Sequence, residues 1–140
     1  MKVLYNEFQY NKFYKEILSG NRAVYIYSID DEYIAEISLV YENDDGDYTI
    51  PGKRAYVSRL VVKKSFRRRG IGKELVNFIK TEAERQGFAE LSIGVNLDNY
   101  GAIKLYAESG FDKIICIDED QDGRFAKLLC NLQKSSNPEA

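Results

Sequence analysis

The stretch that most constrains the fold lies between residues 54 and 95, where the pattern of apolar residues changes twice. Residues 54–63 are rich in β-branched side chains and predict a strand. Residues 70–86 repeat apolar side chains at helical spacing, and Gly87 stands where a helix typically ends. Residues 90–95 alternate apolar and polar side chains, as in a second strand. This order predicts a βαβ unit in which the two strands are parallel neighbours.

The run KSFRRRGIGK, residues 64–73, connects the first strand to the helix. A helix N-terminus presents unpaired N–H groups and the positive end of the helix dipole. Gly70 and Gly72 lack a Cβ atom, so an anion can approach their backbone closely. The cationic side chains around them are those of Arg67, Arg68, Arg69 and Lys73. We therefore expect a polyanion site, most simply for a pyrophosphate, with an exposed basic turn as the alternative.

Two familiar phosphate motifs do not fit this junction. A P-loop requires Ser or Thr after its Gly-Lys pair, and Glu74 stands at that position. A dinucleotide fingerprint requires a third glycine three residues after Gly72, and Leu75 stands there. The expected polyanion site is therefore of another kind.

The rest of the chain alternates helices and strands without an internal repeat. The predicted elements are a short strand over 3–5, a helix over 7–18, a hairpin of strands over 23–29 and 33–41, an acidic loop over 42–52, a helix over 100–109 that Asp98 or Asn99 caps, and strands over 111–117 and 125–132 around an acidic turn at 118–123. They predict an α/β (α+β) fold with a mixed sheet covered by helices. We expect one domain, residues 1–133, and a disordered tail, residues 134–140.

Composition narrows the range of functions. The chain has 140 residues, a net charge of −2 and a pI of about 5.3, so binding to nucleic acid is not expected. It has no histidine, which removes His-based triads and His ligands, and we expect no metal. Cys116 and Cys130 are expected to be reduced core residues. No apolar run approaches the roughly 18 residues of a membrane span, no secretory pattern is visible, and the cytoplasm is the expected compartment.

The apolar alternation of the strand before the junction slips by one residue. Ala55 and Val57 are in one phase, and Leu60 and Val62 resume in the other. The slip predicts a β-bulge near Arg59 or Leu60. Such a bulge would splay the strand and free N–H groups for a ligand, and an edge irregularity without a role is the alternative.

Two longer motifs lie within residues 54–117. The run VSRLVVKKSFRRRGIGKELV holds an L-x-V strand end followed by Arg-x-x-Gly-x-Gly, and the run NLDNYGAIKLYAESGF holds N-x-x-A-x-x-L-Y-x-x-x-G-F. Together they resemble the acetyl-CoA motif and the later signature of the GNAT superfamily of N-acetyltransferases. The matching positions are Leu60, Val62, Arg67, Gly70, Gly72, Asn99, Ala102, Leu105, Tyr106, Gly110 and Phe111. Residues 1–50 match only in the order of their elements.

The resemblance implies a mixed, mostly antiparallel sheet that is splayed at its centre and flanked by helices, with acetyl-CoA as co-substrate in the splay. The amides of residues 68–73 would hold the pyrophosphate, the strand end at 60–62 would pair with the pantetheine, and a bulge amide would polarise the thioester carbonyl. Asn99 would contact CoA and start a helix, with capping alone as the alternative. The cofactor-binding residues implied in this way are Leu60, Val61, Val62, Arg67, Arg68, Arg69, Gly70, Ile71, Gly72, Lys73, Asn99, Ala102 and Tyr106.

The resemblance also suggests the catalytic groups. Tyr106 would act as the acid that protonates the departing CoA thiolate, and simple packing is the alternative. Some family members carry a glutamate four residues before the position of Leu60, where this chain has Tyr56. The base is therefore open, and the candidates are Glu36, Tyr56, Ser58 and a water chain.

The implied reaction is direct transfer of the acetyl group of acetyl-CoA to a primary amine, without an acyl-enzyme. A catalytically silent CoA-binding module is the alternative, because Tyr56 stands in place of a carboxylate. The acidic stretches at 42–47 and 118–122 favour a cationic acceptor, such as a polyamine, an aminoglycoside or a lysine-bearing peptide, with plain solvated loops as the alternative. We expect a monomer or homodimer without a membrane or nucleic-acid partner.

Overall fold

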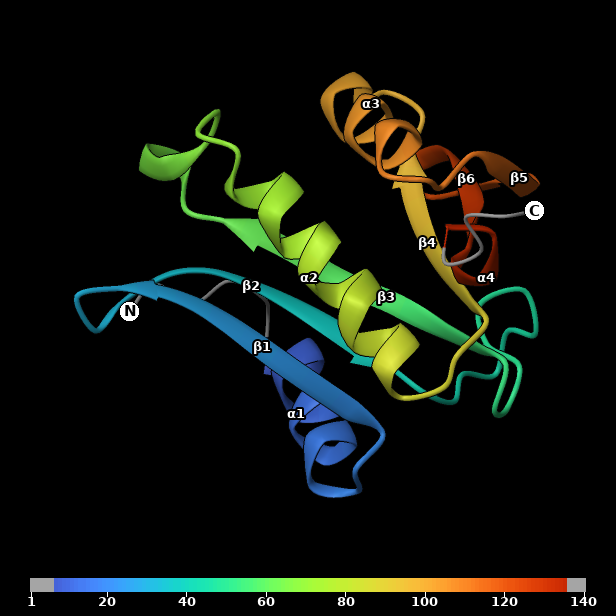
Figure 1. Ribbon diagram of the computed structural model, residues 1–140, viewed down its shortest axis with the longest axis horizontal. Helices are drawn as coiled ribbons and strands as arrows, with labels where there is room; N and C mark the ends of the chain where they lie inside the picture. The colour runs from blue at the N-terminus through green and yellow to red at the C-terminus, as the bar shows by residue number, and fades with distance from the viewer. Residues whose placement is uncertain (1–6, 136–140) are drawn as a thin grey trace.

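The computed structural model describes residues 7–135, with side chains for residues 12–133 (Figure 1). The elements in chain order are α1 Glu7–Leu18, β1 Arg22–Ile29, β2 Glu32–Val40, β3 Arg54–Val62, a 3₁₀ turn Lys64–Phe66, α2 Ile71–Arg85, β4 Glu90–Asn96, α3 Tyr100–Glu108, β5 Lys113–Asp120, β6 Gly123–Asn131 and α4 Leu132–Ser135. The predicted order is confirmed. The short strand expected over 3–5 and the tail residues 136–140 lie outside the described residues.

The prediction was wrong at two places near the C-terminus. Strand β5 continues through Asp118–Asp120, so the expected acidic turn shrinks to Gln121 and Asp122. Pairing with β6 overrides the low strand propensity of these acids, and Glu119 lies opposite Arg124. The last predicted strand ends earlier than expected, because the chain turns into α4.

The strands form one sheet in the order β1-β2-β3-β4-β6-β5, in which only the β3–β4 pair is parallel. That pair covers only Arg54–Val57 of β3 and Glu90–Ile93 of β4, although both strands continue beyond it. Figure 1 shows the two strands diverging from their shared end. The mixed sheet splayed at its centre, which the sequence predicts, is confirmed. We call the end of the pairing, Val57 and Ile93, the splay point.

The expected β-bulge is present one residue before the predicted position. Ser38 of β2 pairs with Arg59, and Leu39 pairs with Val57, so Ser58 is the extra residue. The bulge therefore lies directly after the splay point of β3. An inserted residue bends and twists the strand that carries it, which is the local reason for β3 turning away from β4.

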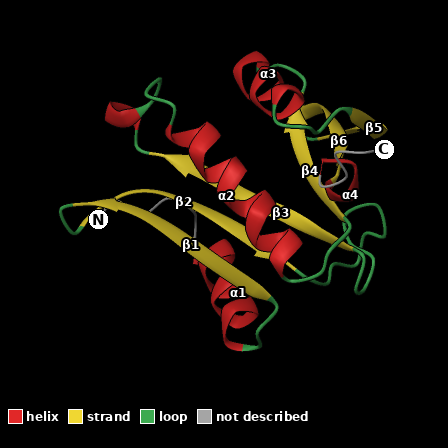
Figure 2. Ribbon diagram, viewed as in Figure 1, coloured by secondary structure: helices red, strands yellow, loops and turns green. Residues whose placement is uncertain are grey.

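Helix α2 covers one face of the half-sheet formed by β1, β2 and β3 (Figure 2). Its buried residues are Ile71, Leu75, Val76, Ile79 and Ala83. They join the core with side chains of β2 and β3, and full burial of each large aliphatic side chain contributes about 1.5–3 kcal/mol. No helix among residues 7–135 has the length and apolar character needed to cross a membrane.

Helix α1 contacts the opposite face through a buried arginine. The guanidinium of Arg22 lies 4.1 Å from the Phe13 ring centroid and forms an ion pair with Glu16 at 3.1 Å. The same guanidinium donates a hydrogen bond to Ser58 Oγ at 2.8 Å. These contacts connect α1 to the bulge in β3.

Candidate active site

The chain enters α2 through two residues with left-handed backbone. Gly70 caps the helix with φ of 81°, and Arg68 has φ of 65°. Glycine adopts this conformation without cost, whereas an arginine pays about 1–2 kcal/mol. Local strain of this kind is concentrated at ligand sites, which marks this junction as a candidate.

The backbone amides of this junction are unpaired over a continuous stretch. The Arg67 N–H donates to the Lys64 carbonyl, and the Glu74 N–H donates to the Gly70 carbonyl. Between them, no described residue accepts a hydrogen bond from the amides of residues 68–73. A run of free amides at the positive end of a helix is an anion-binding arrangement.

The cationic side chains at the junction differ in how they are held. Arg67 Nε donates to the Val62 carbonyl at 3.1 Å, and the Arg69 guanidinium lies 5.1 Å from the Phe66 ring centroid. Lys73 is exposed on the first turn of α2. The structure therefore places positive charge both at the helix start and at the end of β3.

The end of β3 presents backbone groups toward the diverging strand β4. The Lys63 N–H donates to the Ile34 carbonyl of β2, so by alternation the N–H and C=O groups of Leu60 and Val62 point the other way. We call this side, over residues 58–62, the unpaired edge of β3. The Val62 carbonyl accepts a hydrogen bond from the Arg67 side chain, so this carbonyl is accessible to a donor.

Gly72 joins the helix start to the two elements that flank it. A Cβ atom on Gly72 would lie 3.4 Å from Leu105 Cδ2 of α3 and 3.9 Å from Leu60 Cδ2 of β3. The glycine thus allows the first turn of α2 to pack closely beside the unpaired edge. The predicted positions Leu60, Gly70, Gly72 and Leu105 are therefore neighbours in the structure, although they lie on three elements.

Asn99 caps α3, as the sequence predicts. Its side-chain oxygen accepts a hydrogen bond from the Ala102 N–H at 3.1 Å. That amide is satisfied by the cap, so Ala102 can contribute to a ligand site only through its carbonyl or its small side chain.

Replacing Asn99 with alanine is expected to lower the free energy of unfolding by about 1 kcal/mol, because the Ala102 amide loses its partner. Asn99→Asp keeps a capping oxygen and should stay within about 0.5 kcal/mol of the native protein. Urea unfolding followed by circular dichroism measures both values. An alanine variant as stable as the native protein would contradict the capping role.

Tyr106 projects from α3 into the core. It is 8% exposed and its ring centroid lies 6.0 Å from that of Phe111. Burial, with a smaller electrostatic contribution from Tyr56, raises the pKa of Tyr106 to about 12. The hydroxyl has no hydrogen-bond partner among the described residues. Tyr106 therefore keeps its proton at neutral pH and has it available for donation.

Glu36 and Tyr56, two of the three residues named as candidates for the base, are engaged in other contacts. Burial raises the pKa of Tyr56, and the opposing effect of Arg22 is smaller, so Tyr56 is a protonated phenol at neutral pH. Glu36 accepts a hydrogen bond from the Tyr33 hydroxyl at 2.7 Å and lies 3.8 Å from Arg59 Nε. Of these two residues, only Tyr56 contributes to the raised pKa of Tyr106.

The acidic loop after β2 is less available to a ligand than its composition indicates. Lys127 Nζ of β6 lies 2.6 Å from Asp45 Oδ2 and 3.0 Å from Asp47 Oδ2. The ion pair lowers the pKa of Asp45 and raises that of Lys127, mainly through the side-chain hydrogen bond between them. Two of the loop carboxylates therefore share one lysine of the protein, which offsets part of their negative charge.

The cysteines are free, as predicted, but the prediction that both lie in the core holds only for Cys130. Cys130 is buried, and burial raises the pKa of its thiol. Cys116 is only partly buried and its Sγ lies 3.8 Å from Asp47 Oδ2. Cys116 therefore lies beside the acidic loop and outside both motifs.

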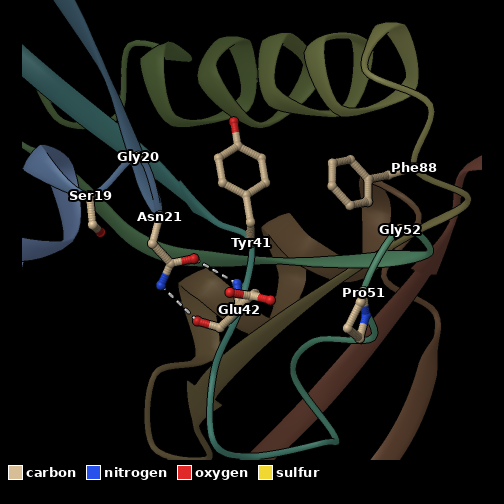
Figure 3. Close-up of a pocket in the computed structure, with 8 residues that line it drawn as sticks. All are labelled: Ser19, Gly20, Asn21, Tyr41, Glu42, Pro51, Gly52 and Phe88. Carbon is tan, nitrogen blue, oxygen red and sulfur yellow. Dashed lines mark hydrogen bonds between the residues drawn. The ribbon is translucent and has the colours of Figure 1, made fainter.

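A separate hollow of about 580 Å³ lies at the other end of α2, beyond the helix C-terminus. Figure 3 shows Tyr41 and Phe88 on one side of it, with ring centroids 5.8 Å apart, and the paired Asn21 and Glu42 on the other. None of the predicted site residues lines this hollow. The hollow is therefore separate from the candidate site at the start of α2.

A splayed sheet whose unpaired edge meets an open helix N-terminus is an α/β arrangement that can hold an extended polyanionic ligand. The acetyltransferase (GNAT) family model matches residues 2–111. The chain belongs to this family, and the predicted membership is confirmed.

Individual relatives agree with this membership. GCN5-related N-acetyltransferase 4, chloroplastic, of Arabidopsis thaliana is 40% identical over 60 residues, which are 43% of this chain and 21% of that protein. Probable N-acetyltransferase san of Drosophila melanogaster is 27% identical over 111 residues, 79% of this chain and 55% of that protein. The chain thus spans about a fifth to a half of these relatives' lengths.

The fold agrees as well. The crystal structure of a GNAT family acetyltransferase from Elizabethkingia anophelis with acetyl-CoA bound superimposes with a TM-score of 0.70 at 18% identity. The superposition covers 86% of this chain and 82% of that chain. The mixed sheet with its flanking helices is therefore the fold of this family.

Proposed function

We propose that the protein transfers the acetyl group of acetyl-CoA directly to a primary amine. The observation that carries the proposal is the run of unpaired amides at residues 68–73, which opens beside the unpaired edge of β3. A diphosphate fits the first feature and an extended amide-containing chain fits the second. Acetyl-CoA has both parts, and it is bound in the related Elizabethkingia anophelis structure.

In this proposal the junction holds the donor and β3 orients it. The amides of residues 68–73 bind the pyrophosphate, with Arg67, Arg68 and Lys73 supplying positive charge. The backbone of Leu60 and Val62 pairs with the pantetheine arm. The Leu60 N–H, beside the bulge at Ser58, polarises the thioester carbonyl.

The proton for the leaving group is assigned to Tyr106. The amine attacks the thioester carbon, the C–S bond breaks, and Tyr106 donates its proton to the leaving sulfur. Tyr56 carries its own proton at neutral pH, so it contacts the incoming amine as a hydrogen-bonding group and not as a phenolate. The amine proton leaves through Ser58, Glu36 or water. Orientation and carbonyl polarisation supply most of the acceleration.

The test is release of free CoA thiol from acetyl-CoA in the presence of an amine panel that contains a polyamine, an aminoglycoside and a lysine-bearing peptide. We expect amine-dependent release, with acetylated amine detected by mass spectrometry. A silent CoA-binding module is the second candidate, because the strand position used by some relatives for a carboxylate holds Tyr56. Tight acetyl-CoA binding by calorimetry without turnover on any amine would favour that module.

A further inference from the structure

Tyr48 of the acidic loop, which precedes β3 in the chain, packs against the splay point of β3 and β4. Its ring stacks on Tyr56 of β3, with centroids 4.2 Å apart and an interplanar angle of 24°. Its carbonyl accepts a hydrogen bond from Ser92 Oγ of β4 at 2.6 Å. Tyr48 therefore bridges the two strands where their pairing ends.

The Tyr48 hydroxyl occupies the space of a missing side chain on β4. A Cβ atom on Gly94 would lie 2.5 Å from Tyr48 Oη, which is closer than real contacts allow, and 3.4 Å from the ring carbon Cζ. Gly94 is the first residue of β4 beyond the splay point. The glycine is thus required for the phenol to sit where β3 and β4 begin to diverge.

The aromatic stack lies on the face of the sheet opposite α2. Tyr56 pairs with Ser92, and Gly94 follows two positions later, so these three residues share one face. Leu91 and Ile93, which alternate with them, belong to the core that α2 covers. The acceptor in the proposed reaction can approach Tyr56 from this second face, opposite the helix that holds the donor.

Contacts within the acidic loop hold Tyr48 in this position. Lys127 of β6 pairs with Gly94 of β4. Its ammonium group binds both Asp45 and Asp47 of the loop. Arg54 Nη1 also donates to the Asp47 carbonyl at 2.8 Å. The loop is therefore anchored to both arms of the splayed sheet.

We propose that Tyr48 is a positioning residue that acts through Tyr56. Stacking on Tyr48 holds the Tyr56 ring at the splay point. The space left by the missing side chain of Gly94 holds Tyr48 itself in place. This inference rests on the proposed acetyl transfer and assigns Tyr48 to the acceptor side. Loss of the Tyr48 side chain therefore lowers kcat for the amine and leaves acetyl-CoA binding intact.

A double-mutant cycle between positions 48 and 94 tests the inference. Gly94→Ala places a methyl group against Tyr48 Oη, so we expect kcat to fall about tenfold with the most active amine of the panel. Tyr48→Phe keeps the ring and the stack and should be close to native. In the Tyr48→Phe background the ring atom nearest to the new methyl group is 3.4 Å away, so Gly94→Ala should lower kcat by less than about twofold.

Further measurements keep the inference falsifiable. The acetyl-CoA dissociation constant should stay within about twofold of the native value in every variant. General unfolding would change kcat and this dissociation constant together. Tyr48→Leu removes the stack without adding an atom and should also lower kcat. Tyr41→Leu, which removes the separate Tyr41–Phe88 pair, is the matched control and should not.

The outcomes separate this inference from the proposed function. Equal losses from Gly94→Ala in the native and Tyr48→Phe backgrounds, or native turnover by Tyr48→Leu, would overturn the role of Tyr48 alone. Absence of amine-dependent turnover by the native chain would overturn the proposed function, and this inference with it.

Discussion

Gly72→Glu is expected to abolish binding of acetyl-CoA. The first turn of α2 lies against Leu60 and Leu105 at this residue, and the neighbouring amides are the proposed pyrophosphate site. A carboxylate about 4 Å from a phosphate charge near a protein surface costs about 4 kcal/mol, or about a thousandfold in affinity. Gly72 has ordinary helical backbone, so the loss does not require a strained φ.

Isothermal titration calorimetry with acetyl-CoA measures this loss. Asn77→Glu is the matched control, because it adds the same charge on the exposed side of α2, away from the helix start. The control should bind acetyl-CoA like the native protein. Native affinity in Gly72→Glu, with the fold intact by circular dichroism, would refute the assignment of the pyrophosphate to the start of α2.

Tyr106→Phe is expected to lower kcat by about a hundredfold and to leave acetyl-CoA affinity nearly unchanged. The phenol is buried and has no hydrogen-bond partner among residues 7–135, so removing its oxygen breaks no hydrogen bond within that part of the protein. The expected loss is therefore that of the proton donated to the leaving thiolate. Steady-state kinetics of CoA release and calorimetry separate the two quantities.

The pH dependence of the same variant gives a second test. The active form of Tyr106 is the protonated phenol, which is lost only as the pH rises through its pKa of about 12. The Tyr106→Phe defect should therefore be the same at about pH 7 and about pH 9. Tyr100→Phe, on the exposed start of the same helix, is the control and should behave as native. Equal rates for Tyr106→Phe and native protein would remove the acid assignment.

The candidate donor site could be predicted from the sequence because it is made by local backbone structure. A strand, a run of cations with two glycines, and an amphipathic helix follow one another directly in residues 54–86. Helix geometry alone leaves the first N–H groups unpaired, so the anion site follows from the position of the helix start. The cap of α3 at Asn99 is local in the same way.

The proposed acceptor side could not be predicted, because long-range contacts assemble it. Tyr48 meets Gly94 only after the loop folds across the sheet, and no spacing in the sequence relates the two residues. Lys127 lies 82 residues from Asp45 in the sequence, and their ion pair anchors the acidic loop to the sheet. The sequence predicted only an exposed, negatively charged loop there. Pairing with β6 likewise made a strand of the acids at 118–120.

The sequence by itself determined the family, the order of the elements and the helix start that we propose as the pyrophosphate site, since these depend on neighbours within a few residues and on helix and strand periodicity. Only the tertiary structure decided where β3 and β4 separate, which phenols gather at that point and which carboxylates remain free. Those features depend on register and on packing between residues far apart in the chain, and burial there also sets the pKa of Tyr106 and Tyr56.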